Sequence, residues 1–166
     1  MQLLAMLVLL FGCSRAWPQQ KSAPVVPLPP QILTAKKAFI SNAGLDAISL
    51  AAFRRAGDPN APYNKFYLAM RTWGRWELVN TPADADLVLQ LHFSAPVSDC
   101  VKLTSYQPQL ELAILDTKTH FRLWTLTEPV EGAYRKATFE KNVSKGIESL
   151  IDDLKQLAAG PAAPGS

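Results

Sequence analysis

Regular alternation of apolar and polar residues over residues 87–94 most strongly constrains the fold of this chain. Every second residue from Leu87 to Phe93 is large and apolar, whereas the positions between them include Gln90, His92 and Ser94. Because successive side chains of a β-strand point to opposite faces, this pattern predicts a strand with one buried face. Such a strand needs neighbouring strands and a covering layer, so we expect a sheet with other elements packed against one side.

Further strand patterns follow in the second half of the chain. The same alternation recurs over residues 110–115, and a turn at 116–119 joins this segment to residues 121–126. The two segments and the short turn between them are typical of a β-hairpin. Shorter strand patterns occur at residues 37–41 and 76–79. The sequence therefore predicts a sheet of about four to five strands, mainly antiparallel.

Two amphipathic helices are predicted to cover this sheet. The first spans about residues 59–73, with Asp58 as its cap, aromatic residues at steps of three and four, and Gly74 at its end. Those aromatic residues could line a ligand groove, but their helical spacing favours a core position. The second helix spans about 138–158, and a weaker helix pattern covers 47–56. Two helices against one face of the sheet give an α+β fold, a two-layer sandwich.

The N-terminus is typical of an export signal. Leu3–Gly12 is a nearly unbroken apolar run, about half the length of a membrane-spanning helix, so we predict a signal peptide over residues 1–16. Cleavage after Ala16 would release a soluble periplasmic or secreted protein. Alternatively, residues 10–13 are similar to a lipobox, in which Cys13 is lipidated and tethers the protein to the outer membrane. We place the soluble form slightly ahead, and expect the true start to lie upstream of Met1, because no basic residue precedes the apolar run.

The rest of the chain divides into a tether, one domain and a tail. Five prolines between Pro18 and Pro30 favour an extended, non-helical tether over residues 17–32. Residues 33–158 form a single predicted domain, and 159–166 form a disordered tail. A formal net charge of +3 gives no indication of a nucleic-acid partner. Once Cys13 is assigned to the signal or lipobox, Cys100 alone remains, so no internal disulfide is expected.

The residue types that carry chemistry form no convincing catalytic or metal set. Asp84 and Asp86 are two residues apart, yet aspartates that precede strands usually accept backbone hydrogen bonds, and no third metal ligand is evident. His92 and His120 have no predictable nucleophile beside them. No glycine-rich phosphate loop occurs, so we expect no nucleotide, other cofactor or metal. A non-enzymatic role is favoured over the alternative of a hydrolase-like enzyme with an unrecognised site.

Short motifs give the chain a resemblance to bacterial envelope proteins. They are Thr81-Pro-Ala-Asp-Ala-Asp-Leu-Val-Leu before a strand, Leu-Asp-Thr-Lys-Thr119 and Leu-Trp124 in the hairpin, and a terminal amphipathic helix. Over about residues 75–158 the chain resembles uncharacterised small exported lipoproteins of the bacterial envelope and, more loosely, the N-terminal domain of TolB. The resemblance implies a periplasmic or outer-membrane accessory module without known catalysis, and it transfers no active-site residue.

The sheet face opposite the helices is the candidate binding surface. A half-apolar, uncovered sheet face often binds a partner, a second copy or a covering segment. We therefore predict an exported envelope protein that acts as a binding or assembly module. Its partner would be an unknown envelope protein or, in a structural homodimer, itself, and it would contact the membrane only through a lipid at Cys13. The register of the last strand is left open, since either Leu123 or Trp124 could face the helices. The residues predicted on this face are Val88, Gln90, His92, Glu111, Ala113, Leu115, Arg122 and Trp124.

Overall fold

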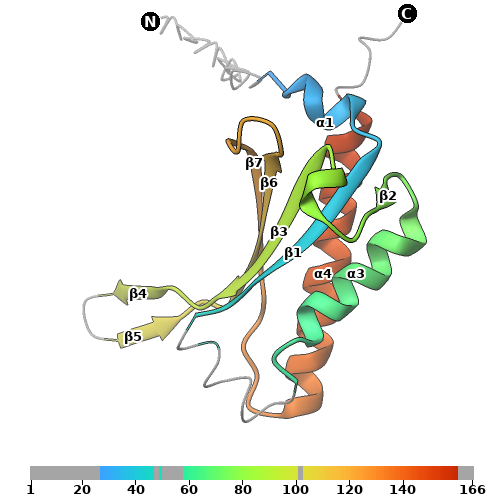
Figure 1. The fold of residues 1–166 in the computed structure, drawn as a ribbon. Coiled ribbons are helices and arrows are strands. Elements are labelled where there is room, and N and C mark those ends of the chain that lie inside the picture. The colour runs from blue at the N-terminus through green and yellow to red at the C-terminus, as the bar shows by residue number, and fades with distance from the viewer. Residues whose placement is uncertain (1–26, 47–48, 50–57, 101–102, 161–166) are drawn as a thin grey trace, which may run out of the picture.

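The computed structural model describes residues 27–46, 49, 58–100 and 103–160. Two long helices pack on the same side of a five-stranded sheet, and a two-stranded hairpin projects from one end of that sheet (Figure 1). The elements in chain order are α1 (Pro30–Thr34), β1 (Lys37–Leu45), α3 (Ala61–Trp73), β2 (Glu77–Leu78), the 3-10 helix η1 (Pro82–Asp84), β3 (Leu87–Ser94), β4 (Val97–Cys100), β5 (Leu103–Tyr106), β6 (Gln109–Asp116), β7 (Arg122–Pro129) and α4 (Lys136–Ala159).

The sheet has the strand order β2-β1-β3-β6-β7. The successive strands β3, β6 and β7 pair antiparallel, whereas β1 runs parallel to both β2 and β3. The parallel pairs arise because the chain crosses through α3 after β1, and a crossover of that length returns the next strand in the same direction. The predicted α+β sandwich is confirmed, with a mixed sheet.

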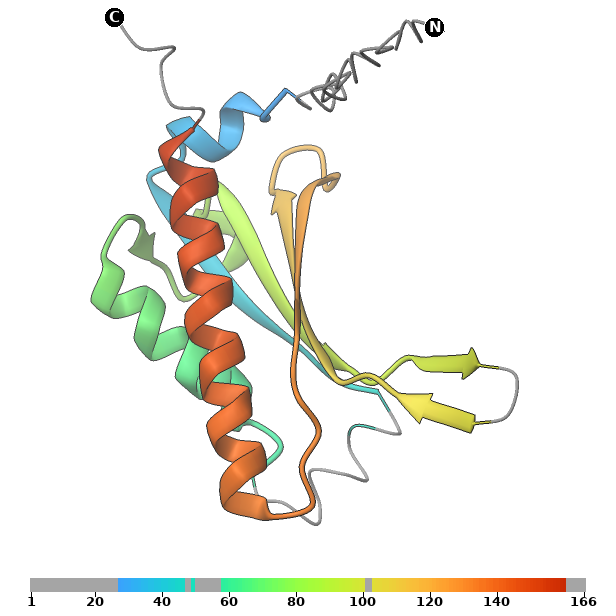
Figure 2. The same ribbon diagram turned by 180° about the vertical axis from the view of Figure 1, so that it is seen from behind.

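The core lies between the sheet and the helices. On β3 and β6 the residues that face α3 and α4 are almost fully buried, with Leu89, Leu110 and Leu112 all 0% exposed. Phe66 and Met70 of α3 and the apolar stripe of α4 complete this layer, as the sequence predicts. Seen from behind, α4 lies across the sheet and hides part of it (Figure 2). The odd-numbered residues of β3 therefore lie on the face that the helices cover, and the even-numbered residues lie on the opposite face.

Both principal helices form where the sequence predicts them, with small differences at their ends. α3 begins at Ala61 with Asn60 as its N-cap residue, whereas Asp58 was expected to cap it. Asp58 instead accepts a hydrogen bond from the backbone N–H of Asn60 at 2.9 Å, in the turn before the helix. Gly74 ends α3 with φ +65, a conformation that glycine adopts readily. α4 extends from Lys136 to Ala159, close to its predicted bounds.

Two segments differ from the sequence predictions, and other predicted features fall on residues that the structure does not describe. The hairpin of β4 and β5 was missed, because its strands lack a strong alternating pattern. α1 begins at Pro30, so the expectation that the proline-rich segment excludes helix is wrong at its end, since proline fits a first helical turn that needs no N–H donor. The signal over 1–16, Cys13 and, apart from Ser49, the predicted helix at 47–56 lie outside the described residues. Within the described ranges, no helix combines the length and apolarity needed to cross a membrane.

The N-terminal and C-terminal helices meet at one end of the molecule. The backbone at Gly160, just after α4, lies against the side chain of Leu33 in α1. Arg75, after α3, donates a hydrogen bond to the carbonyl oxygen of Leu33 at 3.0 Å. The turn between β6 and β7 lies at this same end of the sheet (Figures 1 and 2). Ile32 of α1 is fully buried, so α1 belongs to the folded core.

Candidate functional site

Seven of the eight predicted surface residues lie on the sheet face opposite α3 and α4, which we call the open face. Strand register places them there, because directly paired residues of adjacent strands share a face. Val88 pairs with Leu115, Gln90 with Ala113, and His92 with Glu111. Leu115 also pairs with Arg122 on β7, and Val88 with Phe39 on β1. The seven residues on the open face are Val88, Gln90, His92, Glu111, Ala113, Leu115 and Arg122.

Trp124 is the exception, because it lies on the helix side of the sheet. It pairs with Ile114, a fully buried core residue, and its own side chain packs partly buried against the core. The cause is an irregularity in the β6–β7 register, where Leu115 pairs with Arg122 but Ile114 pairs with Trp124. Leu123 is the additional residue, and such a bulge reverses the face of every residue that follows it. Of the two registers that the sequence left open, the structure therefore has the one in which Trp124 faces the helices, and the assignment of Trp124 to the open face is wrong.

An ion pair crosses the middle of the open face. Arg122 Nη1 lies 3.2 Å from Glu111 Oε1, with the two side chains 54% and 28% exposed. Arg122 pairs with Leu115, so its guanidinium reaches Glu111 only by running along β6 over Ala113, which lies between them on this face. Ala113 is only 3% exposed on this face, where Gln90 and Thr125 flank it on the neighbouring strands. An ion pair this exposed contributes at most about 1 kcal/mol to stability and can rearrange for a ligand.

A polar hollow of about 240 Å³ lies around that ion pair. Its lining includes Gln90 and His92 of β3 and Glu111 of β6. Burial alone would raise the pKa of nearby Asp46. Hydrogen bonds from the backbone N–H groups of Ser49 and Ala95 outweigh this effect, so the pKa of Asp46 lies below its ordinary value. The Asp46 carboxylate therefore stays charged near His92. An amide, an imidazole and a carboxylate side by side offer hydrogen-bond donors and acceptors to a polar partner.

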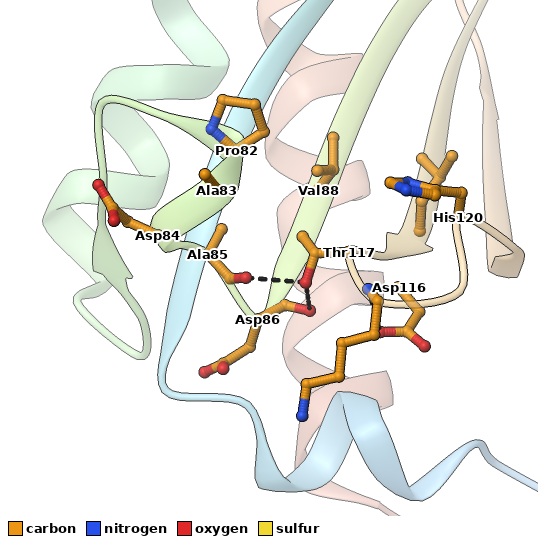
Figure 3. A pocket seen from close by; sticks show the side chains of 11 residues that line it. Pro82, Ala83, Asp84, Ala85, Asp86, Val88, Asp116, Thr117 and His120 are labelled. Atoms are coloured by element: carbon orange, nitrogen blue, oxygen red, sulfur yellow. Dashed lines mark hydrogen bonds between the residues drawn. The ribbon is translucent and has the colours of Figure 1, made fainter.

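A second, larger hollow of about 600 Å³ lies at the end of the open face, between η1 and the β6–β7 turn. Val88 lies between the two walls, with Pro82 and Ala83 on one side and His120 on the other (Figure 3). His120 adopts φ +59, an uncommon conformation for a residue other than glycine, within the tight turn. The volume falls in the range of small-molecule pockets, roughly 300–1,000 Å³.

Two of the aspartates that line this hollow, Asp86 and Asp116, have structural roles. Asp86 Oδ2 accepts hydrogen bonds from the backbone N–H groups of Lys36 and Lys37 at 2.8 and 3.0 Å, and these bonds hold the pKa of Asp86 below its ordinary value. The hydroxyl of Thr119 and then the N–H of Lys118 lower the pKa of Asp116 in the same manner. The expected structural role of Asp86 is therefore confirmed. Among the residues that the structure describes, no cluster of three metal-binding side chains is present.

Part of the open face was missed by sequence reasoning. Phe39 and Ser41 of β1 lie beside Val88 and Gln90, and Thr125 of β7 lies beside Ala113. The short pattern of residues 37–41 predicted a strand, but not that it runs parallel to β3 or which of its residues share the open face. The hollow beside η1 was missed because it depends on two segments that approach each other only in the folded chain.

No family model matches the chain, and no curated protein matches it in sequence. Several solved structures are similar to it at low identity and low TM-score. A variant PelC dodecamer from Paraburkholderia phytofirmans is 16% identical, with a TM-score of 0.45 over 72% of this chain and 86% of that one. Uncharacterised lipoprotein B from Nitrosomonas europaea is 17% identical, with a TM-score of 0.42 over 81% and 90%. A minor lipoprotein from Acinetobacter baumannii is 16% identical, with a TM-score of 0.42 over 84% and 100%.

Because the identities and TM-scores are low, these likenesses carry no argument about what this chain does. Two of the three proteins are bacterial lipoproteins by name, as are the families that the sequence motifs resemble. The looser similarity to the N-terminal domain of TolB stays a prediction. What the chain does must therefore be inferred from its own surface.

Proposed function

We propose that this chain is an exported protein of the bacterial envelope that binds a partner protein through its open face. One observation supports the proposal above all: among the residues that the structure describes, the helices α3 and α4 cover one side of the sheet, and polar and apolar side chains gather on the other. The polar centre contains Gln90, His92 and the Glu111–Arg122 ion pair, and an apolar end contains Val88 and Leu115. A surface of mixed polarity with an apolar part and a polar remainder is typical of non-obligate protein interfaces.

The side-chain chemistry of this face favours binding over catalysis. His92 and His120 line two different hollows and stand on different elements, so they do not form a shared acid–base pair. The ion pair and the amide of Gln90 can exchange hydrogen bonds with a polypeptide, whose backbone offers both donors and acceptors. The apolar end supplies area that gains free energy when a partner removes it from water, at about 25 cal/mol per Å².

Site-specific photocrosslinking in the native host tests this proposal. A photoreactive residue in place of Gln90 would lie on the open face, and the matched control would replace Glu148, an exposed residue of α4. We expect one discrete crosslinked protein from position 90 and none of that mass from position 148. Equal crosslinking at both positions, or none at either, would contradict a specific partner on the open face.

Export is the second part of the proposal, and it depends on residues 1–16. The intact mass of the mature protein, compared between wild type and Cys13→Ala, separates the two processing routes. A mature chain that begins at a diacylated Cys13 supports a tethered lipoprotein, and one that begins at Trp17 supports a soluble periplasmic or secreted protein. A full-length chain that retains Met1 would contradict export.

A further inference from the structure

The two edges of the five-stranded sheet differ in length and protection. At one edge, β2 contains only Glu77 and Leu78, and a short, charged edge strand is a common protection against further pairing. At the other edge, β7 runs for eight residues, Arg122–Pro129. No strand pairs with its outer side among the residues that the structure describes, and α4 packs against β7 from the covered face of the sheet. A long unpaired edge is able to pair with an additional strand.

The direction of the backbone groups along β7 follows from its hydrogen bonds. The N–H of Val130 donates to the carbonyl oxygen of Pro108 at 2.7 Å, toward the β6 side. Backbone groups alternate in direction along a strand, so the even-numbered residues of β7 face β6. Thr125 and Thr127 therefore direct their N–H and C=O groups outward. Pro129 is also odd-numbered, so the N–H group that proline lacks would point outward and no hydrogen bond to β6 is lost.

We propose that β7 pairs antiparallel with β7 of a second copy of this chain, about a two-fold axis at Leu126. The sequence Thr125-Leu126-Thr127 reads the same in both directions, so this axis pairs Thr125 with the partner's Thr127. Leu126 then lies beside the partner's Leu126. Both pairings are favourable across strands, since threonine pairs and apolar pairs each stabilise a sheet. A two-fold contact of this kind is self-complementary and closes at a dimer.

Charge and burial support a second copy as the occupant of this edge. With the axis at Leu126, Glu128 lies opposite the partner's Trp124, so the two Glu128 carboxylates do not face each other. Trp124 and Leu126 pack only partly buried against their own core, at the margin of the helix layer. A paired strand would bury more of both side chains. The bulge at Leu123 and the missing N–H of Pro129 limit the pairing at its two ends, which fixes the register.

This interface leaves the open face free, so it does not depend on the proposed partner there. The test measures the mass of the processed protein by sedimentation as its concentration rises. Wild type should reach twice the monomer mass. Thr125→Pro and Thr127→Pro each remove one outward N–H without affecting the bonds to β6, and should leave a monomer. Thr125→Ala and Thr127→Ala keep the N–H and should still dimerise.

A wild type that stays monomeric at its solubility limit would overturn the proposal, as would proline variants that dimerise like wild type. Cysteine crosslinking supplies a second measurement if the proline variants fail to fold. In a Cys100→Ser background, Thr125→Cys with Thr127→Cys should form an intermolecular disulfide. Paired Cα atoms in the hydrogen-bonded register lie about 5.5 Å apart, within disulfide range. Thr125→Cys alone should not form one, and equal crosslinking of both variants would contradict the two-fold axis at Leu126.

Discussion

The two faces of the sheet are built from the same strands, yet their side chains differ in burial and in polarity. On the helix side, Leu89 and Leu112 are completely buried, and their side chains fill fixed positions against α3 and α4. On the open face, their neighbours Gln90 and Glu111 are only partly buried, and an exposed ion pair holds the centre. One face therefore determines whether the chain folds, whereas substitutions on the other can change binding and leave the fold intact.

The largest expected difference is between Leu112→Ala and Gln90→Ala. Leu112→Ala removes a fully buried side chain and leaves a cavity, which should lower the free energy of unfolding by about 2–5 kcal/mol. Gln90→Ala changes only the open face and should shift it by less than about 0.5 kcal/mol. Urea unfolding of both variants measures the two effects. If the two costs are similar, the open face contributes to the core and the comparison fails.

A second pair of substitutions sharpens the comparison at the β6–β7 bulge. Trp124→Lys places a charge on the helix side, where Trp124 packs against the core, and should cost about 1–3 kcal/mol of stability. Leu115→Lys places the same charge on the open face, where it should cost less than about 1 kcal/mol. Thermal unfolding of the two variants distinguishes the registers. A larger cost for Leu115→Lys than for Trp124→Lys would contradict the placement of Trp124 on the helix side and Leu115 on the open face.

The contrast between these two residues also shows where sequence reasoning reached its limit. Period-two patterns on β3 and β6 predicted which of their residues face the helices, because each pattern is unbroken. On β7 one bulged residue, Leu123, reverses the alternation, and no local residue type marks it. The parallel pairing of β1 with β3 was equally invisible, because it depends on the crossover through α3. The residues of β3 and β6 on the open face could be predicted from the sequence, whereas those of β1 and β7 could be assigned only from the structure.

A smaller effect is expected at the end of the open face, where Asp86 joins η1 to the start of β1. Asp86→Asn weakens the acceptor for the N–H groups of Lys36 and Lys37, and should cost about 1 kcal/mol at neutral pH, since the group is exposed and screened. Asp153→Asn, on the exposed side of α4, is the matched control and should change stability little.

The pH dependence of that effect has a definite sign. The pKa of Asp86 is lowered by folding from 3.8, so its contribution is fully present above pH 3.8 and is lost as the pH falls through the lower folded-state pKa. The stability advantage of wild type over Asp86→Asn should shrink in that acidic window. An advantage that grows on acidification would contradict the role of the carboxylate.

The smallest expected effect concerns the ion pair. Glu111→Gln removes the charge beside Arg122 and should change the free energy of unfolding by less than about 1 kcal/mol, with less change at high salt. The same substitution should reduce crosslinking from position 90 if the open face binds a polar partner. Unfolding measured at low and high salt, together with crosslinking yield, separates the two roles.

Thiol labelling on the open face tests the central claim most directly. In a Cys100→Ser background, Gln90→Cys and the α4 control Glu148→Cys would be labelled with a maleimide, both in the native envelope and after purification. We predict that position 90 reacts after purification and is protected in the envelope, whereas position 148 reacts in both. Equal reactivity of position 90 in both settings would mean that the open face is bare in the cell, and would contradict its role as a binding surface.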